Sequence, residues 1–213
     1  DDPTRTFRDA FYLASTGRPG PVLIDVPSDL SSAEMVFHYP DKISLPSYRP
    51  TYKGNAKQVR QAVACIQESK RPLIYAGGGI VTSHACSELT ELAERMQIPV
   101  VTSLMGKGAM RCSNPLNLGP VGMHGSKYAN MAVTECDLLI AVGARFSDRV
   151  TGKVDEFAPH AKIIHIDIDP AEIGKIIDPA VPIVGDAKVV LGAINDRLEK
   201  TEAQPVGTEW VKT

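Results

Sequence analysis

The sequence lacks the cysteine pattern of a metal or disulfide protein. Its 213 residues include four cysteines, Cys65, Cys86, Cys112 and Cys136, which lie far apart with neither a C-x-x-C pair nor a histidine at metal-ligand spacing. We therefore expect no metal site, and a reducing, cytoplasmic compartment is favoured.

Long apolar runs and a surplus of one charge are also missing. No stretch approaches the ~18 apolar residues typical of a membrane span, and DDPTRTFRDA at the start is not a secretion signal. The 23 basic and 25 acidic residues are mixed along the chain and give a net charge of −2. We therefore expect neither a membrane nor a nucleic-acid partner. The missing initiator methionine leads us to expect a piece of a longer protein.

What the sequence does contain is an alternation of helix and strand patterns. Between residues 53 and 200, amphipathic helix patterns alternate with the short apolar runs LIYA, IPVVT, LLIAV and KIIHID. Strands of this kind are buried on both faces, which is typical of a parallel sheet covered by helices on each side. We predict an α/β, doubly wound, mostly parallel, Rossmann-like domain over 53–200.

The flanking regions differ from this pattern. An amphipathic helix capped by Asp2 and the apolar run Val22–Val26, predicted as a buried strand, cannot form a domain alone. We interpret residues 1–30 as the C-terminal tail of a preceding domain. Residues 31–52 interleave prolines with tyrosines and are predicted to be an interdomain linker held against a surface by those tyrosines. Residues 201–213 are predicted to be an exit linker.

In an open parallel sheet, ligands bind at the carboxyl ends of the strands. After LIYA comes the triplet Gly77–Gly79, with Thr82 or Ser83 placed to cap the next helix. Such glycines let a phosphate or ribose approach the backbone, and a plain tight turn is the alternative. The nicotinamide fingerprint G-x-G-x-x-G is not matched, because its third glycine falls on Thr82.

The loops after the next strands carry cationic and apolar side chains. Ser103, Leu104 and Met105 follow IPVVT, and GARFSDR, with Arg145 and Arg149, follows LLIAV. Two arginines beside a glycine turn suit bidentate binding of a diphosphate or carboxylate. The alternative is a surface arginine paired with the neighbouring aspartate.

Carboxylates follow the last two strands. Asp167 ends KIIHID, where dinucleotide folds hold the adenosine ribose. Asp169 and Glu172 fit a capping box, with Pro170 at the first helical position. Gly185–Asp186 follows Ile183–Val184, and a helix cap alone also explains Asp186. Together the strand ends predict a dinucleotide laid across the sheet edge.

Catalytic residues are hardly indicated. His124, on the turn G-M-H-G, fits an acid, a base or a hydrogen-bond donor to a flat ring, whereas His165 inside an apolar strand is interpreted as a core residue. The sequence has no G-x-S-x-G and no paired carboxylates with acid–base logic.

The segments GRPGPVLIDVP, LIYAGGG, GMHG, GARFSDRVTGK, IIHIDIDPAEIGK and VPIVGDAK together resemble the large catalytic subunit of acetohydroxyacid synthase (acetolactate synthase). This is a thiamine-diphosphate enzyme of branched-chain amino acid biosynthesis. The resemblance implies that residues 1–30 end its pyrimidine-binding domain and that 53–200 form its central domain, which binds FAD structurally. For the full-length protein it implies thiamine diphosphate, Mg²⁺, pyruvate and other 2-keto acid substrates, a homo-oligomer and a small regulatory subunit.

By the resemblance, flavin contacts carry over to the positions whose motifs match. These are Arg18, Gly77, Gly78, Gly79, Ser103, Leu104, Met105, Val121, Gly122, Met123, His124, Gly143, Ala144, Arg145, Arg149, Val150, Asp167, Ile168, Asp169, Glu172, Gly185 and Asp186. Arg149 and Met123 also match family residues that line the route to the active site. The family's catalytic glutamate and its G-D-G…N diphosphate and magnesium motif are absent, so we expect the chain alone to be inactive.

Three positions depart from the family pattern. Ser28 replaces a lysine, Ser147 replaces an aspartate, and Pro120–Val121 replaces Met-Leu, which bears on substrate handling and flavin contacts. The alternative within the same chemistry is glyoxylate carboligase, which has a similar HIDI-x-P-x-x-IG segment. Alternatives of other classes are a nicotinamide-dependent dehydrogenase and a nonenzymatic nucleotide-binding module.

Overall fold

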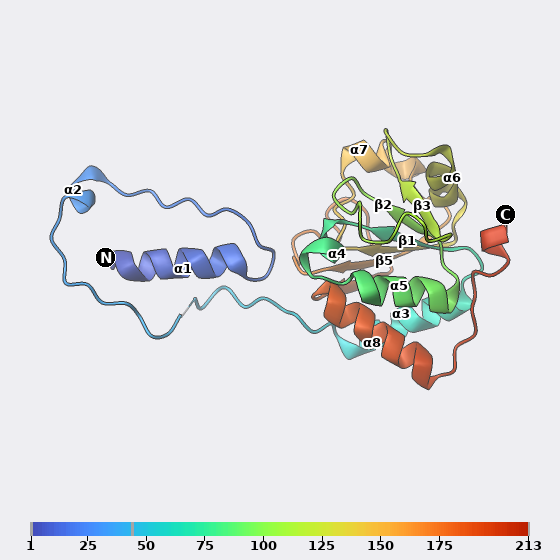
Figure 1. Cartoon of the computed structure of the whole chain (residues 1–213), viewed down its shortest axis with the longest axis horizontal. Helices are drawn as coiled ribbons and strands as arrows, with labels where there is room; N and C mark the ends of the chain where they lie inside the picture. Colours follow the sequence, from blue (N-terminus) through green and yellow to red (C-terminus); the bar gives the residue numbers. More distant parts are fainter. Residues whose placement is uncertain (1, 44, 213) are drawn as a thin grey trace. The chain divides into compact units, whose positions relative to one another are not determined.

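The computed structural model describes residues 2–43 and 45–212, and the chain divides into two compact units, residues 1–50 and 51–213 (Figure 1). The first unit contains helices α1 (Pro3–Ser15) and α2 (Ser28–Ser31). As predicted, Asp2 caps α1, because its side chain accepts a hydrogen bond from the Arg5 backbone N–H at 3.2 Å.

Two tyrosines of the predicted linker pack against α1. The Tyr48 hydroxyl donates to the Thr16 carbonyl at 2.8 Å, and its ring meets that of Tyr12 edge-on at 5.9 Å. The guanidinium of Arg8 lies 4.9 Å from the centre of the Tyr39 ring. The surface against which these tyrosines pack is therefore α1, a helix of the same unit.

The strand predicted at Val22–Val26 is wrong. This segment has no regular structure, and Leu23 is 92% exposed. A strand is stabilised by pairing with a neighbour, and the described residues of the first unit contain no strand to pair with. An apolar run alone does not make a strand without that partner.

The second unit is built on a six-stranded parallel sheet with the order β3-β2-β1-β4-β5-β6. The strands are β1 (Pro72–Ala76), β2 (Val100–Thr102), β3 (Asn117–Pro120), β4 (Leu138–Val142), β5 (Lys162–Asp167) and β6 (Val181–Val184). The direction of strand succession reverses between β1 and β4, which is the topological switch point of a doubly wound fold. The predicted fold class is confirmed, although β3 was not predicted as a strand.

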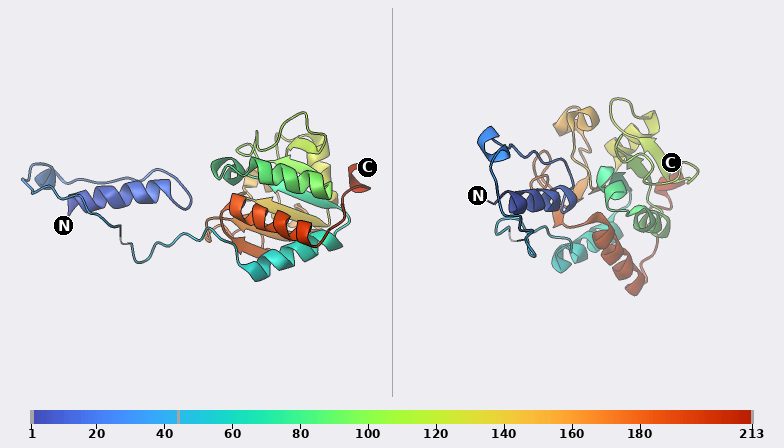
Figure 2. Two further views of the ribbon diagram at one scale, coloured as in Figure 1. Left: turned by 60° about the horizontal axis from the view of Figure 1, so that its bottom comes forward. Right: turned by 60° about the vertical axis from the view of Figure 1, so that its left-hand side comes forward.

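Helices cover both faces of this sheet (Figures 1 and 2). One face carries α3 (Ala56–Glu68), α4 (Gly78–Thr82), α5 (Cys86–Met96) and α8 (Ala187–Lys200), and the other carries α6 (Lys127–Glu135), α7 (Asp148–Thr151) and the 3-10 turn η1 (Val154–Glu156). Side chains alternate along β1, so Ile74 joins the first core cluster and Tyr75 the second. The sheet is thus buried on both sides, as its apolar runs predict.

A carboxylate organises the amino-terminal edge of the sheet. Asp137, just before β4, accepts hydrogen bonds from the Ser69 hydroxyl and from the backbone N–H groups of Lys70 (2.8 Å) and Arg71 (2.9 Å). Burial alone would raise the pKa of Asp137, but these bonds outweigh it and hold the pKa below its ordinary value. The ionised carboxylate therefore ties the end of α3 to the start of β4.

The described residues after α8 pack against the rest of the second unit. The backbone N–H groups of Val206 and Gly207 donate to the Met96 carbonyl at 3.2 and 3.1 Å, and a short 3-10 turn, η2 (Trp210–Lys212), follows. The Trp210 ring packs against the second core cluster. Within the described ranges, no helix is both long and apolar enough to cross a membrane.

Candidate functional site

The strand registers bring the predicted site residues to one edge of the sheet. The last residues of β1 to β4 are paired, with Ala76 opposite Thr102 and Val142, and Thr102 opposite Pro120. Val142 is paired with Ile166, one residue before the end of β5. Gly78 begins α4 directly after β1, Met123 and Arg145 lie in the loops that follow β3 and β4, and Asp167 ends β5. The expectation that these four share the carboxyl edge is confirmed.

The glycines beside the switch point allow two loops to pack backbone against backbone. A Cβ on Gly77 would lie 1.9 Å from the Gly143 carbonyl oxygen, and one on Gly143 would lie 2.5 Å from the Gly79 Cα. The amides of Gly77 and Gly79 donate to the carbonyls of Val142 (2.9 Å) and Gly143 (3.1 Å). The amides of two of the three glycines in the triplet are therefore engaged within the protein, and loop packing explains Gly77, Gly79 and Gly143 by itself, which is the alternative of a tight turn.

Thr82 and Ser83 do not cap the following helix as predicted. The glycine triplet itself starts α4, so both residues fall at its C-terminal end, where their hydroxyls donate to the carbonyls of Gly78 (3.1 Å) and Gly79 (2.7 Å). Helix α5 begins only after Ala85. The capping prediction failed because a short helix, α4, already starts at Gly78, so Thr82 and Ser83 lie at its end and not at the start of α5.

The two arginines after β4, Arg145 in the loop and Arg149 in α7, are exposed and have no partner among the described residues. Neither the Arg145 nor the Arg149 guanidinium forms an ion pair or hydrogen bond there. The Asp148 carboxylate accepts instead from the backbone N–H of Arg149 at 2.9 Å. The ion pair with Asp148, which was the alternative interpretation, is therefore not formed. Both positive charges remain available to bind an anion.

A buried brace fixes the backbone on both sides of Arg145. The His165 Nε2 lies 2.9 Å from the Ala144 carbonyl, which only accepts, so Nε2 carries the proton. The Phe146 ring, 2% exposed, packs edge-on against His165 at 5.0 Å although its φ of +50° is left-handed. Left-handed backbone in a bulky residue costs on the order of 1–3 kcal/mol and persists only where packing determines it.

The buried groups beneath this loop are neutral. Burial lowers the pKa of His165, although the Ala144 carbonyl and the Glu172 charge raise it in part. Burial likewise raises the pKa of Tyr75 to about 12, against a lowering by Arg145. The interpretation of His165 as a core residue is confirmed, since the ring is fully buried.

Apolar side chains are exposed at the same edge. Leu104, Met105 and Met123 are 79%, 72% and 62% exposed, and they follow the adjacent strands β2 and β3. The turn after β2 is closed by the Ser103 hydroxyl, which accepts from the Gly106 N–H at 3.0 Å. Apolar side chains exposed together at one edge are a candidate binding surface.

The G-M-H-G turn is joined to the arginine loop through the backbone. The Met123 N–H donates to the Arg149 carbonyl at 3.0 Å. Gly122 has φ +103°, and a Cβ there would lie 2.5 Å from the same carbonyl oxygen. Val121 is buried below the turn, whereas His124 is exposed. Met123, His124 and Arg149 thus belong to one connected loop assembly.

The carboxylates after β5 and β6 have local structural roles. Asp167 accepts from the Asp169 N–H at 2.9 Å, Asp169 accepts from the Ala171 N–H at 3.0 Å, and Asp186 caps α8 through the Val189 N–H at 3.1 Å. The helix predicted after Asp169 is wrong, because residues 170–174 form only turns. Gly174, with φ +73°, ends the turn before a helix can propagate.

Of the remaining predicted contact residues, three follow β5 or β6, and one, Arg18, lies in the first unit. Ile168 is half-buried, Glu172 is buried with its carboxylate 3.5 Å from the Lys175 ammonium, and Gly185 is buried beside α8. Arg18 lies in the first unit, so its flavin contact stays a prediction. Among the described residues, no group of three or more His, Cys, Asp or Glu side chains is placed to hold a metal ion.

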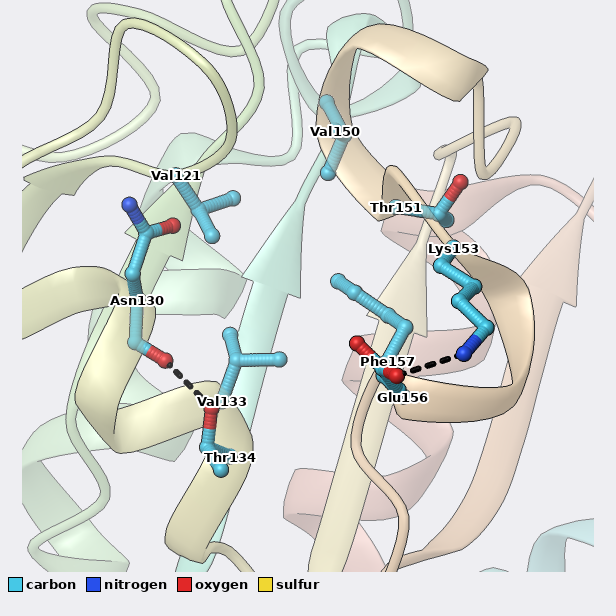
Figure 3. A pocket seen from close by; sticks show the side chains of 9 residues that line it. All are labelled: Val121, Asn130, Val133, Thr134, Val150, Thr151, Lys153, Glu156 and Phe157. Carbon is cyan, nitrogen blue, oxygen red and sulfur yellow. Dashed lines mark hydrogen bonds and ion pairs between the residues drawn. The ribbon is translucent and has the colours of Figure 1, made fainter.

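A pocket of about 160 Å³ lies behind the joined loops. Figure 3 shows Asn130 and Val133 of α6 on one side of it and Val150 and Phe157 on the other. Asn130 was missed by the sequence reasoning, because a single asparagine on a helix carries no local signal of a contact to a distant turn. The second unit is thus a doubly wound α/β domain whose carboxyl edge presents cations without a partner among the described residues and exposed apolar side chains, features typical of ligand sites in such folds.

Comparison with known proteins gives the particular family. Residues 59–194 match the model of the thiamine pyrophosphate enzyme central domain, and the chain belongs to this family. It is 58% identical over 189 residues to a probable acetolactate synthase large subunit of Methanocaldococcus jannaschii, covering 87% of this chain and 32% of that protein. It is 53% identical over 215 residues to the acetolactate synthase large subunit of Corynebacterium glutamicum, covering 99% and 34%. The chain thus spans about a third of the length of these relatives.

Proposed function

We propose that the chain is the central part of an acetolactate synthase large subunit and that it holds FAD across the carboxyl edge of its sheet. The similarity to named acetolactate synthase large subunits supports the first half of this proposal. The reaction proposed for the complete enzyme is the decarboxylation of pyruvate and the joining of the two-carbon unit to a second 2-keto acid, for which thiamine diphosphate and Mg²⁺ would be the cofactors. A homo-oligomer and a small regulatory subunit belong to the same proposal.

The observation that carries the FAD proposal is that two arginines without a partner among the described residues and three exposed apolar side chains lie at the same edge of the sheet. Arg145 and Arg149 match the charge of a diphosphate, and Leu104, Met105 and Met123 match the apolar face of a flat ring. We assign the adenosine ribose to Asp167 at the end of β5. The residues present therefore fit FAD in charge and polarity.

The proposed role of FAD in this enzyme is structural. Bound FAD contributes a planar ring and a diphosphate that fill the edge of the domain, with no net redox change in the reaction. The chain's own residues orient the ring with apolar contacts and neutralise the diphosphate with the two guanidiniums. The chain alone is proposed to form no acetolactate.

Titration of the purified chain with FAD, NAD and ADP tests the FAD proposal. We expect FAD to bind most tightly, and Arg145→Ala and Arg149→Ala each to raise its Kd about 10-fold to 100-fold, since a charge-assisted hydrogen bond contributes about 1.5–3 kcal/mol. Arg60→Ala, an exposed arginine on α3, is the matched control and leaves the Kd unchanged. Tighter binding of NAD would favour a nicotinamide-dependent dehydrogenase, and equal binding of ADP would favour a nonenzymatic nucleotide-binding module.

Product analysis of the complete enzyme that contains this chain tests the reaction. Acetolactate from pyruvate is the expected product. Tartronate semialdehyde from glyoxylate, without acetolactate from pyruvate, would instead identify a glyoxylate carboligase. The family names of the relatives favour the first outcome.

A further inference from the structure

Asn130 holds the G-M-H-G turn from outside the predicted site. It lies in the second turn of α6, and its side-chain amide bonds both backbone groups of Gly122: Oδ1 accepts from the N–H at 2.9 Å, and Nδ2 donates to the carbonyl at 3.1 Å. Because an N–H only donates and a carbonyl only accepts, one orientation of the amide satisfies both. The side chain thus acts as a two-point clamp on one residue of the turn.

The helix that carries this clamp is itself fixed to β3. Ser126 caps α6 by accepting from the Ala129 N–H at 3.0 Å, and its hydroxyl donates to the Leu118 carbonyl at 3.1 Å. The buried face of α6, which includes Ala129 and Val133, packs in the second core cluster. The clamp therefore starts from a rigid element and not from a loop.

The clamped residue transmits its position to two site residues. Gly122 sits against the Arg149 carbonyl, and the adjacent Met123 N–H donates to that same oxygen. The side chains of Met123 and Arg149 are exposed, so their placement depends largely on this backbone arrangement. We propose that Asn130 is a positioning residue that sets Met123 and Arg149 for FAD binding, an inference that rests on the proposed function.

The open space beside Asn130 allows the clamp to be tested by substitution. Its side chain lines the pocket of Figure 3 together with Thr134 and Val150, so a replacement of similar size meets open space on that side. Asn130→Leu removes both bonds, and Asn130→Asp keeps the acceptor for the Gly122 N–H but places a carboxylate oxygen against the Gly122 carbonyl. Thr134→Val is the matched control, because Thr134 lines the same pocket and bonds only the Asn130 backbone carbonyl, at 3.1 Å.

Two measurements on the 213-residue chain test the proposal. Hydrogen–deuterium exchange reports the clamp without any ligand, and we expect the Gly122 and Met123 amides to exchange at least about tenfold faster in Asn130→Leu than in the wild type. FAD titration reports the positioning role, and we expect the Kd to rise at least about tenfold in both Asn130 variants at pH 7.5. Thr134→Val should change neither quantity, and the thermal midpoint of Asn130→Asp, which loses one bond and gains a repulsive contact, should fall by only about 2–4 °C, so that the variant stays folded during the titration.

A pH series distinguishes positioning from a general structural effect. Protonation of the carboxyl introduced by Asn130→Asp restores a donor toward the Gly122 carbonyl, so the ratio of its FAD Kd to that of the wild type should fall toward one as the pH is lowered from about 7.5 to about 5. Unchanged amide exchange in Asn130→Leu would overturn the clamp, and an unchanged Kd in both variants would overturn the positioning role. If the wild-type chain binds no FAD, the proposed function fails and the FAD-positioning inference falls with it, while the exchange measurement still decides whether the clamp exists.

Discussion

A methyl group added at Gly77 should disrupt the contact between the loops at the switch point. Gly77 has φ −96° and ψ −176°, a backbone that alanine adopts without strain, so the effect of Gly77→Ala is steric. The new Cβ would lie 1.9 Å from the Gly143 carbonyl oxygen and 2.6 Å from the Ala144 Cα, and both contacts are with backbone that cannot rotate away. We expect a loss of about 1–3 kcal/mol in the free energy of unfolding, the range for an overpacked core.

Gly192→Ala is the control for this substitution. Gly192 lies in α8, where an added Cβ would meet no atom within 4 Å, so alanine should stabilise the helix by about 0.5–1 kcal/mol. Urea unfolding followed by the fluorescence of Trp210, the single tryptophan, compares the two variants in the second unit. The loop-packing argument is refuted if Gly77→Ala unfolds at the same urea concentration as Gly192→Ala or at a higher one.

Three further predictions concern charge. Asp137→Asn should lower the free energy of unfolding by about 1–2 kcal/mol near neutral pH. Since the pKa of Asp137 is lowered in the fold, the wild type keeps this stability above the unfolded value of about 3.9 and loses it below, so urea midpoints of the two proteins should converge in acid. The pKa of His165 is also lowered in the fold, so as the pH drops the unfolded chain takes up a proton at this histidine before the folded chain does. Wild-type stability should therefore fall as the pH drops below about 6.5. His165→Leu should weaken this pH dependence, and an equal slope of stability against pH in the two proteins would count against a buried neutral ring. FAD affinity should decrease with added salt, as measured by titration, and a salt-independent Kd would contradict the role of the two guanidiniums.

Most of the sheet was predictable, because its central strands carry continuous apolar runs. Strand β3 was missed because Asn117–Pro120 contains both a glycine and a proline and its side chains are only partly buried or exposed. Helix α6 was missed because its buried face is made of small residues, Ala129, Ala132 and Val133, which have helical spacing but contrast little in hydrophobicity with the rest of the helix. The strand predicted at Val22–Val26 failed for the opposite reason, since the apolar run has no paired neighbour.

The site was predictable in its place but not in its internal contacts. The rule that ligands bind at carboxyl ends of parallel strands was enough to bring Gly78, Arg145 and Asp167 together. Met123 entered only through the family resemblance, because β3 was missed. It did not show that Gly77 and Gly143 serve to pack two loops, or that Asn130 clamps a turn eight residues away. Such contacts depend on the tertiary arrangement of segments, for which a local pattern contains no signal.

Nuclear magnetic resonance of the ¹⁵N-labelled chain during titration with FAD tests the central claim most directly, because it detects weak binding and locates it. Saturable shifts should appear at the backbone amides of Gly78, Met105, Met123 and Arg145, while amides at the opposite edge, such as that of Asp137, stay unchanged. A folded chain that shows no shifts at millimolar FAD, or shifts confined to other surfaces, would contradict the assignment of this sheet edge to the flavin.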